Sequence, residues 1–525
     1  MDAQKLPRWF LWFCAALVLG GLGLELYQYA GTVSNYPLTT YWSESNRIYS
    51  ASLVYSLRIY GQQLQWPWLD PARSILDGLV LLLPGSQIWM FRFWLAFLSL
   101  GVTCLASIMI ISRLGPISGK TLEKCGLLTA ILIGWGILFF LQGPVYYHVL
   151  LGVVPVLWLF DRRKPARMLF VILAASAWEG LSRVNWFWMP AITAVLLYLL
   201  VTPVDGKKLF AYLKWPVLWL LAGASASGLT YWLFINVTHY PVVFFNPQMR
   251  YAFFSSKLWP NSAFLLGLIP GMALVSFPLL LLIAPVMIKR FRSMHWLRSL
   301  LIVGILVVFF AGSTYVSRRA GGGYDLHNYD TFMVLFFITG LYAGLGCIVW
   351  EHAEEKFTLP GFLPAFTLLL LLAVPFGFAV RNIHPAAPKL SRQQTTALLG
   401  DIQGILAKVE PSQGTVLFID QRQLLVYGMI SGVRLYQPYE KIELMEMAMA
   451  NNHAYRDAFR SQIEQHAYPV IISEIHADAY QNALAPYGYE NNVWFDDVSF
   501  PILKNYQLVY SNKAANIGVY TPANK

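Results

Sequence analysis

The stretch "RWFLWFCAALVLGGLGLELYQYA" at residues 8–30 decides the fold class. It is apolar over the roughly 20 residues that a helix needs to cross a bilayer. Similar runs recur along the 525-residue chain, which is 57% hydrophobic and 12% charged, with a mean hydropathy of +0.51. A soluble domain carries about 25% charged residues. The sequence therefore predicts a polytopic α-helical membrane protein.

We expect about eleven transmembrane helices within a domain that covers residues 1–380. The candidate spans are residues 8–30, 87–112, 125–142, 145–160, 167–182, 186–202, 209–234, 263–287, 297–313, 331–350 and 361–380. Lys and Arg are concentrated in the connections on one side, which indicates a cytoplasmic N-terminus in a plasma (inner) membrane. These loop cations also account for the net charge of +11, so nucleic acid is not an expected partner.

Residues 381–525 differ in composition, because their apolar runs are short and their charge density is higher. "GTVLFID" (414–420) and "YPVIISEI" (468–475) are typical of buried strands. Residues 391–409 and 440–466 have the pattern of amphipathic helices. With a cytoplasmic N-terminus, an odd number of spans places this region on the extracytoplasmic side of the membrane. We therefore expect a small extracytoplasmic α/β domain.

The connection at residues 31–86 contains an isolated acid. In "NYPLTTYWSESNRIYSASLVYSLRIYG" (35–61), Glu44 is the first acid after Glu25 and the last before Asp70. The stretch predicts an amphipathic helix on the membrane surface, with Glu44 in its first turn. Glu44 is either a catalytic carboxylate or a simple helix cap.

Other acids in the same connection are candidates for a second catalytic acid. Asp70 and Asp77 lie in "WPWLDPARSILDG" (66–78), where Asp before Pro is also typical turn chemistry. Asp325 and Asp330 are two further candidates from a later outer segment.

That segment, "SRRAGGGYDLHNYDTF" (317–332), is the densest polar cluster of the outer connections. Its glycines permit close approach of the backbone to a ligand. Tyr324, His327 and Asn328 are candidates for binding a sugar or an acceptor, together with Asn185 from "WEGLSRVNWFWMP" (178–190). The cluster also fits a divalent cation such as Mg²⁺ or Mn²⁺, or a polar loop that caps the next helix.

The orientation of the protein in the membrane does not account for cations in the outer connections. Most of these cations are Arg, whose planar guanidinium suits the binding of phosphate. The alternative is that these side chains anchor the protein at the membrane interface. The candidates for binding a donor phosphate are Arg47, Arg183, Arg250, Lys257, Arg318 and Arg319.

The order of these features resembles the GT-C glycosyltransferases, which are integral membrane enzymes that use polyprenyl-phosphate-linked sugars. The resemblance lies in the acid at the start of the first outer loop, in "SRVNW" and "RAGGGYDLHNYD", and in the C-terminal domain. It implies transfer of a sugar to a cell-envelope glycan, lipid or protein, with inversion. It further implies Glu44 as general base and the outer cations as a phosphate clamp. No cofactor is required, and a divalent cation stays open.

Three other functions compete with this interpretation. A transporter or flippase needs symmetric halves and charges near the bilayer midplane, whereas the polar residues here gather at the outer face. An O-antigen polymerase or ligase uses Arg and His from a large late loop, without an early acid. A non-catalytic scaffold or sensor with an exported domain would bind the lipid-linked sugar without turnover.

Overall fold

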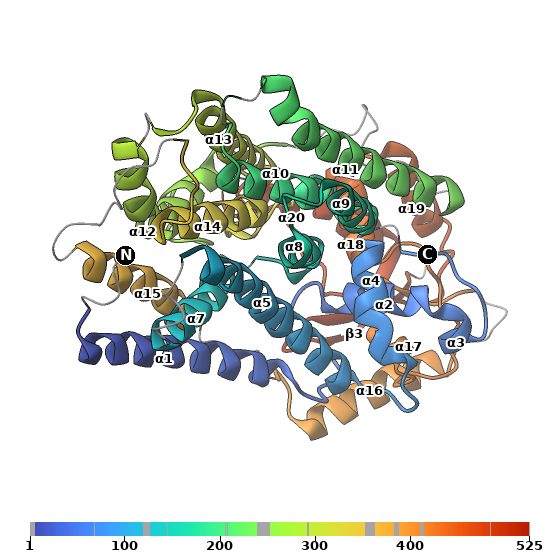
Figure 1. Ribbon diagram of the computed structural model, residues 1–525. Coiled ribbons are helices and arrows are strands. Elements are labelled where there is room, and N and C mark those ends of the chain that lie inside the picture. The colour runs from blue at the N-terminus through green and yellow to red at the C-terminus, as the bar shows by residue number, and fades with distance from the viewer. Residues whose placement is uncertain are drawn as a thin grey trace.

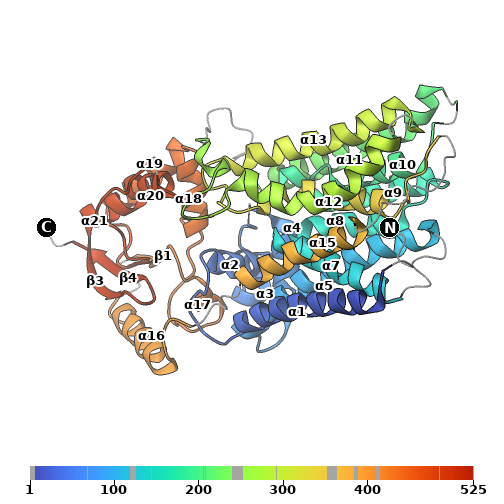
Figure 2. The ribbon, with the colours of Figure 1, turned by 90° about the vertical axis from the view of Figure 1, so that its left-hand side faces the viewer.

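The computed structural model describes residues 6–67, 69–118, 126–143, 145–204, 206, 208–238, 252–290, 293–351, 363–382, 388–409, 414–483 and 485–523. It consists of a bundle of long helices and a smaller C-terminal domain at one end of that bundle (Figures 1 and 2). The N-terminus lies at the opposite end of the molecule from the C-terminus (Figure 2).

Six helical segments in the described part of the chain are long and apolar enough to cross a membrane. They are Arg8–Thr32 (α1), Ile88–Leu114 (in α5, Ile88–Ser118), Val184–Val201 (with α10, Met189–Val201), Leu209–Thr238 (α11), Leu268–Lys289 (in α12, Leu268–Arg290) and Trp296–Ser317 (α13). These six helices indicate a multi-pass membrane protein.

The other predicted spans are also helical but are not among these six segments. They are α7 (Gly126–Gln142), α8 (Tyr147–Leu159), α9 (Pro165–Glu179), α14 (Asp330–Gly344) and α15 (Leu363–Arg381). The prediction of a polytopic helical protein is therefore confirmed in its coarse form, with six segments that satisfy both length and hydropathy.

The bundle has a buried centre and an apolar outside. All residues of α14 are buried, and this helix packs against α10, α12 and α13. By contrast, only 17% of the apolar stretch is buried in α11 and in α13. A helix that is apolar on all sides belongs in a core, and apolar side chains left exposed on long outer helices suit contact with lipid.

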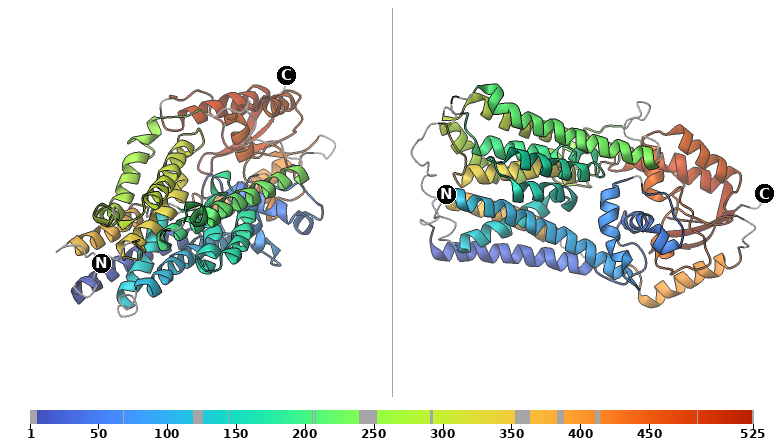
Figure 3. Two further views of the ribbon diagram at one scale, coloured as in Figure 1. Left: turned by 45° about the horizontal axis from the view of Figure 1, so that its top comes forward. Right: turned by 45° about the vertical axis from the view of Figure 1, so that its right-hand side comes forward.

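The first long connection folds into short helices between the bundle and the C-terminal domain (Figure 3, right, blue). They are α2 (Glu44–Val54), α3 (Ser56–Tyr60), α4 (Pro71–Asp77) and a 3₁₀ turn at Gly78–Leu82. The helix predicted after Glu44 is present as α2, but it is buried on most sides and does not have the one exposed face of an amphipathic surface helix. Most of its residues are buried, including Ser45, Asn46 and Ser52. Polar partners in the C-terminal domain compensate this burial, and periodicity does not reveal them.

The C-terminal domain contains a small mixed sheet of four strands in the order β1-β2-β4-β3. These strands are β1 (Leu417–Phe418), β2 (Ile471–Ser473), β3 (Tyr506–Asn512) and β4 (Ile517–Pro522). β1 and β2 are parallel, and the other pairs are antiparallel. Helices α16 (Arg392–Leu406), α17 (Gln423–Val426), α18 (Lys441–Met449), α19 (His453–Glu464), α20 (Gly488–Trp494) and α21 (Phe500–Asn505) surround it.

Candidate functional site

A polar cavity of about 570 Å³ lies where the bundle meets the C-terminal domain. It brings together six of the residues singled out in the sequence, which are Asp70, Arg183, Asn185, Arg319, His327 and Asn328. They come from three segments that are far apart in the chain: the first connection, the turn before α10, and the loop before α14. Aromatic side chains, including Trp188, Tyr231 and Phe253, line the rest of this polar cavity. A concave site with a few convergent polar groups is the usual form of a small-molecule site.

Asp70 is held in an uncommon backbone conformation at the start of α4. Its φ is 48° and its ψ is 59°, which is the left-handed region. Pro71 follows at the first helical position, and a residue before Pro is sterically disfavoured in the right-handed helical region. The Ala72 N–H donates to the Leu181 carbonyl at 2.9 Å, which fixes the start of α4 against the turn before α10. Strained backbone at a polar cavity is typical of functional sites.

Two arginines contact the Asp70 carboxylate. Arg183 Nε and Arg73 Nη1 each lie 3.4 Å from its Oδ2. The two ion pairs of Asp70 among the described residues therefore use the same carboxylate oxygen, Oδ2. The Arg183 guanidinium also lies 4.7 Å from the Tyr146 ring centroid and 5.3 Å from that of Trp186. Contact with two aromatic rings helps to fix the guanidinium in place.

The loop before α14 turns tightly at its glycines. Gly321 and Gly323 both have φ of 73°, where a side chain is strained. A Cβ on Gly323 would lie 2.6 Å from the His327 ring, and one on Gly322 would lie 2.8 Å from the Arg319 carbonyl. Asn328 Nδ2 donates to the Gly322 carbonyl at 2.6 Å and closes the turn. The glycines thus allow Arg319, His327 and Asn328 to line one cavity.

His327 carries a positive charge at neutral pH. Burial on its own lowers its pKa, but Tyr146 and the Asp325 carboxylate outweigh burial and raise the pKa to about 9. Asp325 contacts Nδ1 of the His327 ring directly and is itself half exposed. The same contact lowers the pKa of Asp325, against the opposing effect of desolvation. The polar cavity therefore contains three cationic side chains, Arg183, Arg319 and His327.

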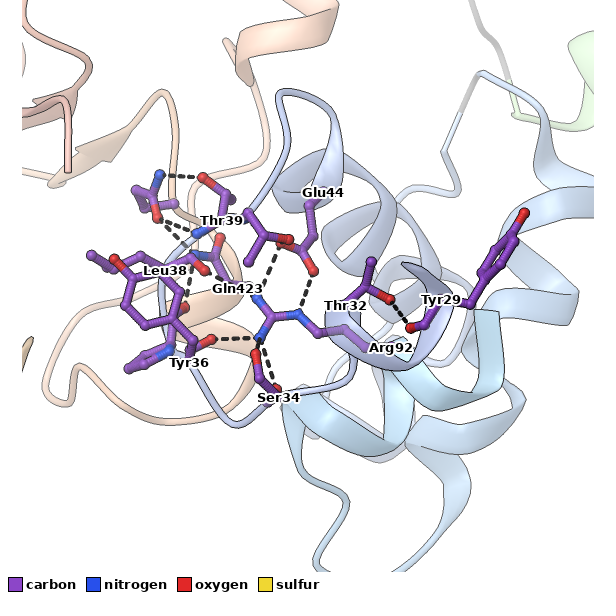
Figure 4. Close-up of polar contacts among 12 residues, drawn as sticks. Tyr29, Thr32, Ser34, Tyr36, Leu38, Thr39, Glu44, Arg92 and Gln423 are labelled. Carbon is purple, nitrogen blue, oxygen red and sulfur yellow. Dashed lines mark hydrogen bonds and ion pairs between the residues drawn. The ribbon is translucent and has the colours of Figure 1, made fainter. Parts of the chain in front are cut away.

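Glu44 lies outside this cavity, in a buried ion pair with Arg92 (Figure 4). Arg92 Nε donates to Glu44 Oε1 at 2.6 Å, and Arg92 Nη2 donates to Oε2 at 3.1 Å. Thr40 donates to Oε2 from both its backbone N–H and its hydroxyl. Glu44 has 0% exposure, so its carboxylate is fully occupied by fixed donors.

The same arginine orders the entry to α2. Arg92 also donates to the carbonyls of Ser34, Tyr36 and Leu38, which belong to the extended segment after α1 (Figure 4). The ion pair thus fastens the first connection to α5. This arrangement supports a structural role for Glu44.

Asp77 and Asp330 are also buried and fully engaged. Arg47 donates to Asp77 Oδ2 from Nε at 3.1 Å and from Nη2 at 2.9 Å, and the Tyr147 hydroxyl donates to Oδ1. Asp330 accepts from Trp186 Nε1 at 2.8 Å and from the Thr331 N–H at 2.6 Å. Of the predicted acids, Asp70 is the one that lines the polar cavity.

The remaining predicted residues connect the bundle to the C-terminal domain or to neighbouring loops. Lys257 is buried between the Arg319 carbonyl, at 2.9 Å, and Glu490, at 3.4 Å. The Tyr324 hydroxyl accepts from the Tyr487 N–H at 3.3 Å. Arg318 Nη2 donates to Ser255 Oγ at 3.1 Å, and Arg318 is not among the described residues that line the cavity. Arg250 lies outside the described residues.

The described residues contain no group of three or more His, Cys, Asp and Glu side chains arranged to hold a metal ion. In the loop where a divalent cation was considered, Asp330 binds Trp186 while Asp325 binds His327. These acids therefore do not converge on a common point.

An apolar side groove of about 550 Å³ adjoins the polar cavity and shares Leu181 and Phe234 with it. This side groove runs along α11, and its other lining residues are Gln63, Leu64, Gln65, Trp66, Thr230, Leu233, Val237 and Thr238. Leu233 and Val237 are exposed on the outer face of the bundle. Two shared lining residues thus place the charged groups of the polar cavity next to a groove that reaches the apolar outer surface.

Several residues of the site were not predicted. Arg92 lies within an apolar span, and a charge at that depth needs a partner, which is the signal that would have indicated it. The rings of Tyr146 and Trp186 contact the Arg183 guanidinium. An aromatic residue in an apolar sequence gives no signal that it makes such a contact. Glu446 reaches the cavity from the C-terminal domain and lies 3.8 Å from Arg319.

Comparison with known proteins gives no match: no protein-family model, no curated protein and no solved structure is similar to this chain. The function is therefore argued from the geometry of the polar cavity.

Proposed function

We propose that this protein is a membrane glycosyltransferase of the GT-C type that moves a sugar from a polyprenyl-phosphate-linked donor to a cell-envelope acceptor. The observation that carries the proposal is the polar cavity, in which Asp70 lies beside three cationic side chains at the mouth of an apolar side groove. A lipid-linked sugar phosphate has the same sequence of parts, since an apolar chain is followed by an anion and then by a polyol.

Asp70 is the general base in this proposal. Its carboxylate takes the proton of the acceptor hydroxyl as that oxygen attacks the anomeric carbon, and the bond from that carbon to the phosphate oxygen breaks. Transfer then proceeds with inversion. The departing polyprenyl phosphate keeps the electron pair, and its charge is stabilised by Arg183, Arg319 and His327.

This assignment replaces Glu44 as the favoured base. A base must come within hydrogen-bond distance of the acceptor hydroxyl. Glu44 is fully buried and both its oxygens accept from Arg92, whereas Asp70 lines the cavity with its second oxygen outside both ion pairs. The strained conformation of Asp70 favours the same assignment.

The side groove along α11 is the proposed place for the polyprenyl chain. Its apolar lining opens at Leu233 and Val237 toward the region that lipid would occupy. In this proposal the N-terminus is cytoplasmic, and the polar cavity and the C-terminal domain lie on the extracytoplasmic side of the plasma membrane.

A polymerase or ligase of lipid-linked glycans is the second candidate, because Arg319 and His327 both come from a late loop. In that case His327 would act as the base. A pKa of about 9 keeps the ring protonated at neutral pH, so it serves better as an electrostatic partner than as a base. Asp70 at the same cavity favours the glycosyltransferase.

The test is a transfer assay with purified full-length protein in lipid nanodiscs. A panel of polyprenyl-phosphate sugars is offered with cell-envelope lipid extract and with soluble glycan acceptors. We expect release of polyprenyl phosphate and a labelled product with inverted anomeric configuration. Binding of every donor without turnover would contradict the proposal and favour a scaffold.

A further inference from the structure

A second pocket lies next to the polar cavity, between α2 and α18, and shares Leu69 with it. This acidic pocket has a volume of about 80 Å³, which admits a small polar group such as an aminomethyl end. Its lining residues are Asn46, Tyr49, Ser50, Leu53, Gln65, Pro67, Leu69, Gln437, Pro438, Glu440, Ile442 and Glu443. Two are carboxylates, and none of these described residues is Lys, Arg or His.

Glu440 presents a carboxylate oxygen that has no protein partner. Its Oε2 accepts from Asn46 Nδ2 at 2.7 Å and from the Ile442 N–H at 2.9 Å, at the N-cap of α18. Its Oε1 has no hydrogen-bond partner among the described residues, although Glu440 is only 1% exposed. An unpaired buried oxygen on a carboxylate is costly, so this oxygen favours a hydrogen-bond donor from a ligand.

Arg422, a cation beside this pocket, makes no ion pair with either carboxylate. Arg422 is fully buried, and its three nitrogens donate to the carbonyls of Phe418, Gln437 and Pro438. Its guanidinium stacks at 4.5 Å on Tyr49. The N–H groups of Arg422 thus donate to the backbone, and the two carboxylates lack a direct ion-pair partner in the described chain.

The pKa values of both acids agree with this environment. Burial raises the pKa of Glu440 to about 7 even though Arg422 and Asn46 oppose it. Burial likewise raises the pKa of Glu443 to about 6. Both groups therefore gain from a positive charge placed between them.

We infer that the acidic pocket binds the primary ammonium group of a ligand, with Glu440 and Glu443 as its anionic partners. Under the proposed function, on which only this last step rests, the ligand is an acceptor whose amine is held here while its hydroxyl reaches Asp70 through the neighbouring cavity. Gln65 and Gln437 close the rim by two mutual hydrogen bonds, at 3.2 and 3.0 Å, so binding depends on docking of the C-terminal domain.

The experiment uses ethanolamine as the probe and ethylene glycol as its uncharged counterpart of similar size. Binding to full-length protein in nanodiscs is followed by ligand-detected saturation-transfer NMR at pH 8, where the probe is cationic and both acids are largely ionised. We expect ethanolamine to bind at least tenfold more tightly than ethylene glycol. Glu443→Gln should weaken ethanolamine at least tenfold, and Glu464→Gln, an exposed acid on α19, should leave it unchanged.

Glu440→Gln should have the same effect as Glu443→Gln. Glu440 also caps α18, so its substitution can disturb folding. If the Glu440 variant does not fold, the result for Glu443→Gln alone tests the inference. Equal binding of the two probes, or unchanged ethanolamine affinity in Glu443→Gln, would overturn the inference. The assay reads binding alone, so its outcome is independent of sugar transfer. Transfer without ethanolamine binding would overturn the ammonium site and keep the proposed function.

Discussion

Asp70 and Arg183 are 113 residues apart in the sequence, and the Asp70 Oδ2 lies 3.4 Å from the Arg183 Nε. This contact joins the strained start of α4 to the turn before α10. It also places a carboxylate and a guanidinium at one cavity, which is the relationship that the proposed transfer requires.

The two adjacent arginines of the late loop should differ in function. Arg319 lines the polar cavity, whereas Arg318 binds Ser255 in a neighbouring segment. Arg319→Ala should raise the KM for a polyprenyl-phosphate sugar about tenfold to a hundredfold, since a charged hydrogen bond contributes about 1.5–3 kcal/mol. Arg318→Ala is the matched control and should change KM less than threefold. Equal effects in both variants would remove Arg319 from the clamp.

Donor binding should weaken in alkaline solution. The pKa of His327 is about 9 in the folded protein against an ordinary value of 6.5, so its charge is present at neutral pH and is lost as the pH rises through about 9. Donor affinity should therefore fall between about pH 8 and pH 10. His327→Gln should bind donor more weakly at pH 7 and show a flatter profile. The groups that face His327 are Tyr146, Asp325 and Arg183, and a fall that persists in His327→Gln would assign the titration to Tyr146 instead.

Glu44→Gln should act on stability. Removing one partner of a buried ion pair leaves an uncompensated charge, here Arg92, and costs about 3 kcal/mol. The apparent unfolding temperature of the protein in nanodiscs should drop by several degrees. The double variant Glu44→Gln with Arg92→Met should recover part of this loss, since neither charge is then buried alone. A Glu44→Gln protein with unchanged stability and no transfer would return the role of base to Glu44.

The side groove should affect donors according to chain length. Leu233 lines this groove and is exposed, so Leu233→Gln should fold normally. It should raise KM for a long-chain polyprenyl donor severalfold and leave a short-chain analogue unchanged. Leu229→Gln, also exposed on α11 but not among the described lining residues of the groove, is the control. An equal rise in KM for the long-chain and the short-chain donor would contradict the binding of the polyprenyl chain in this groove.

The helices could be predicted because length and hydropathy are local properties. Every predicted span overlaps a helix of the described chain, and the strands at 417–418 and 471–473 lie within the predicted runs. Individual polar residues such as Asp70, Arg183 and His327 could also be identified, because polar groups are conspicuous among apolar runs.

Their pairing could not be predicted, because ion pairs form between residues distant in sequence. Arg47 follows Glu44 by three residues, yet Arg47 pairs with Asp77 and Glu44 pairs with Arg92. The isolation of Glu44 in the sequence therefore reflected a buried structural contact. The burial of α2 likewise depends on contacts with the C-terminal domain, which is distant in the sequence.

The central claim, that Asp70 is the base, is tested most directly by the rate of sugar transfer in Asp70→Asn beside Asp325→Asn. Both variants lose one carboxylate near the polar cavity, but Asp325 is half exposed and binds only His327 among the described side chains. We predict that Asp70→Asn lowers kcat about 10²–10⁴-fold in protein that is still folded at the assay temperature, whereas Asp325→Asn keeps kcat within about tenfold. Near-normal turnover in a folded Asp70→Asn protein would contradict the claim.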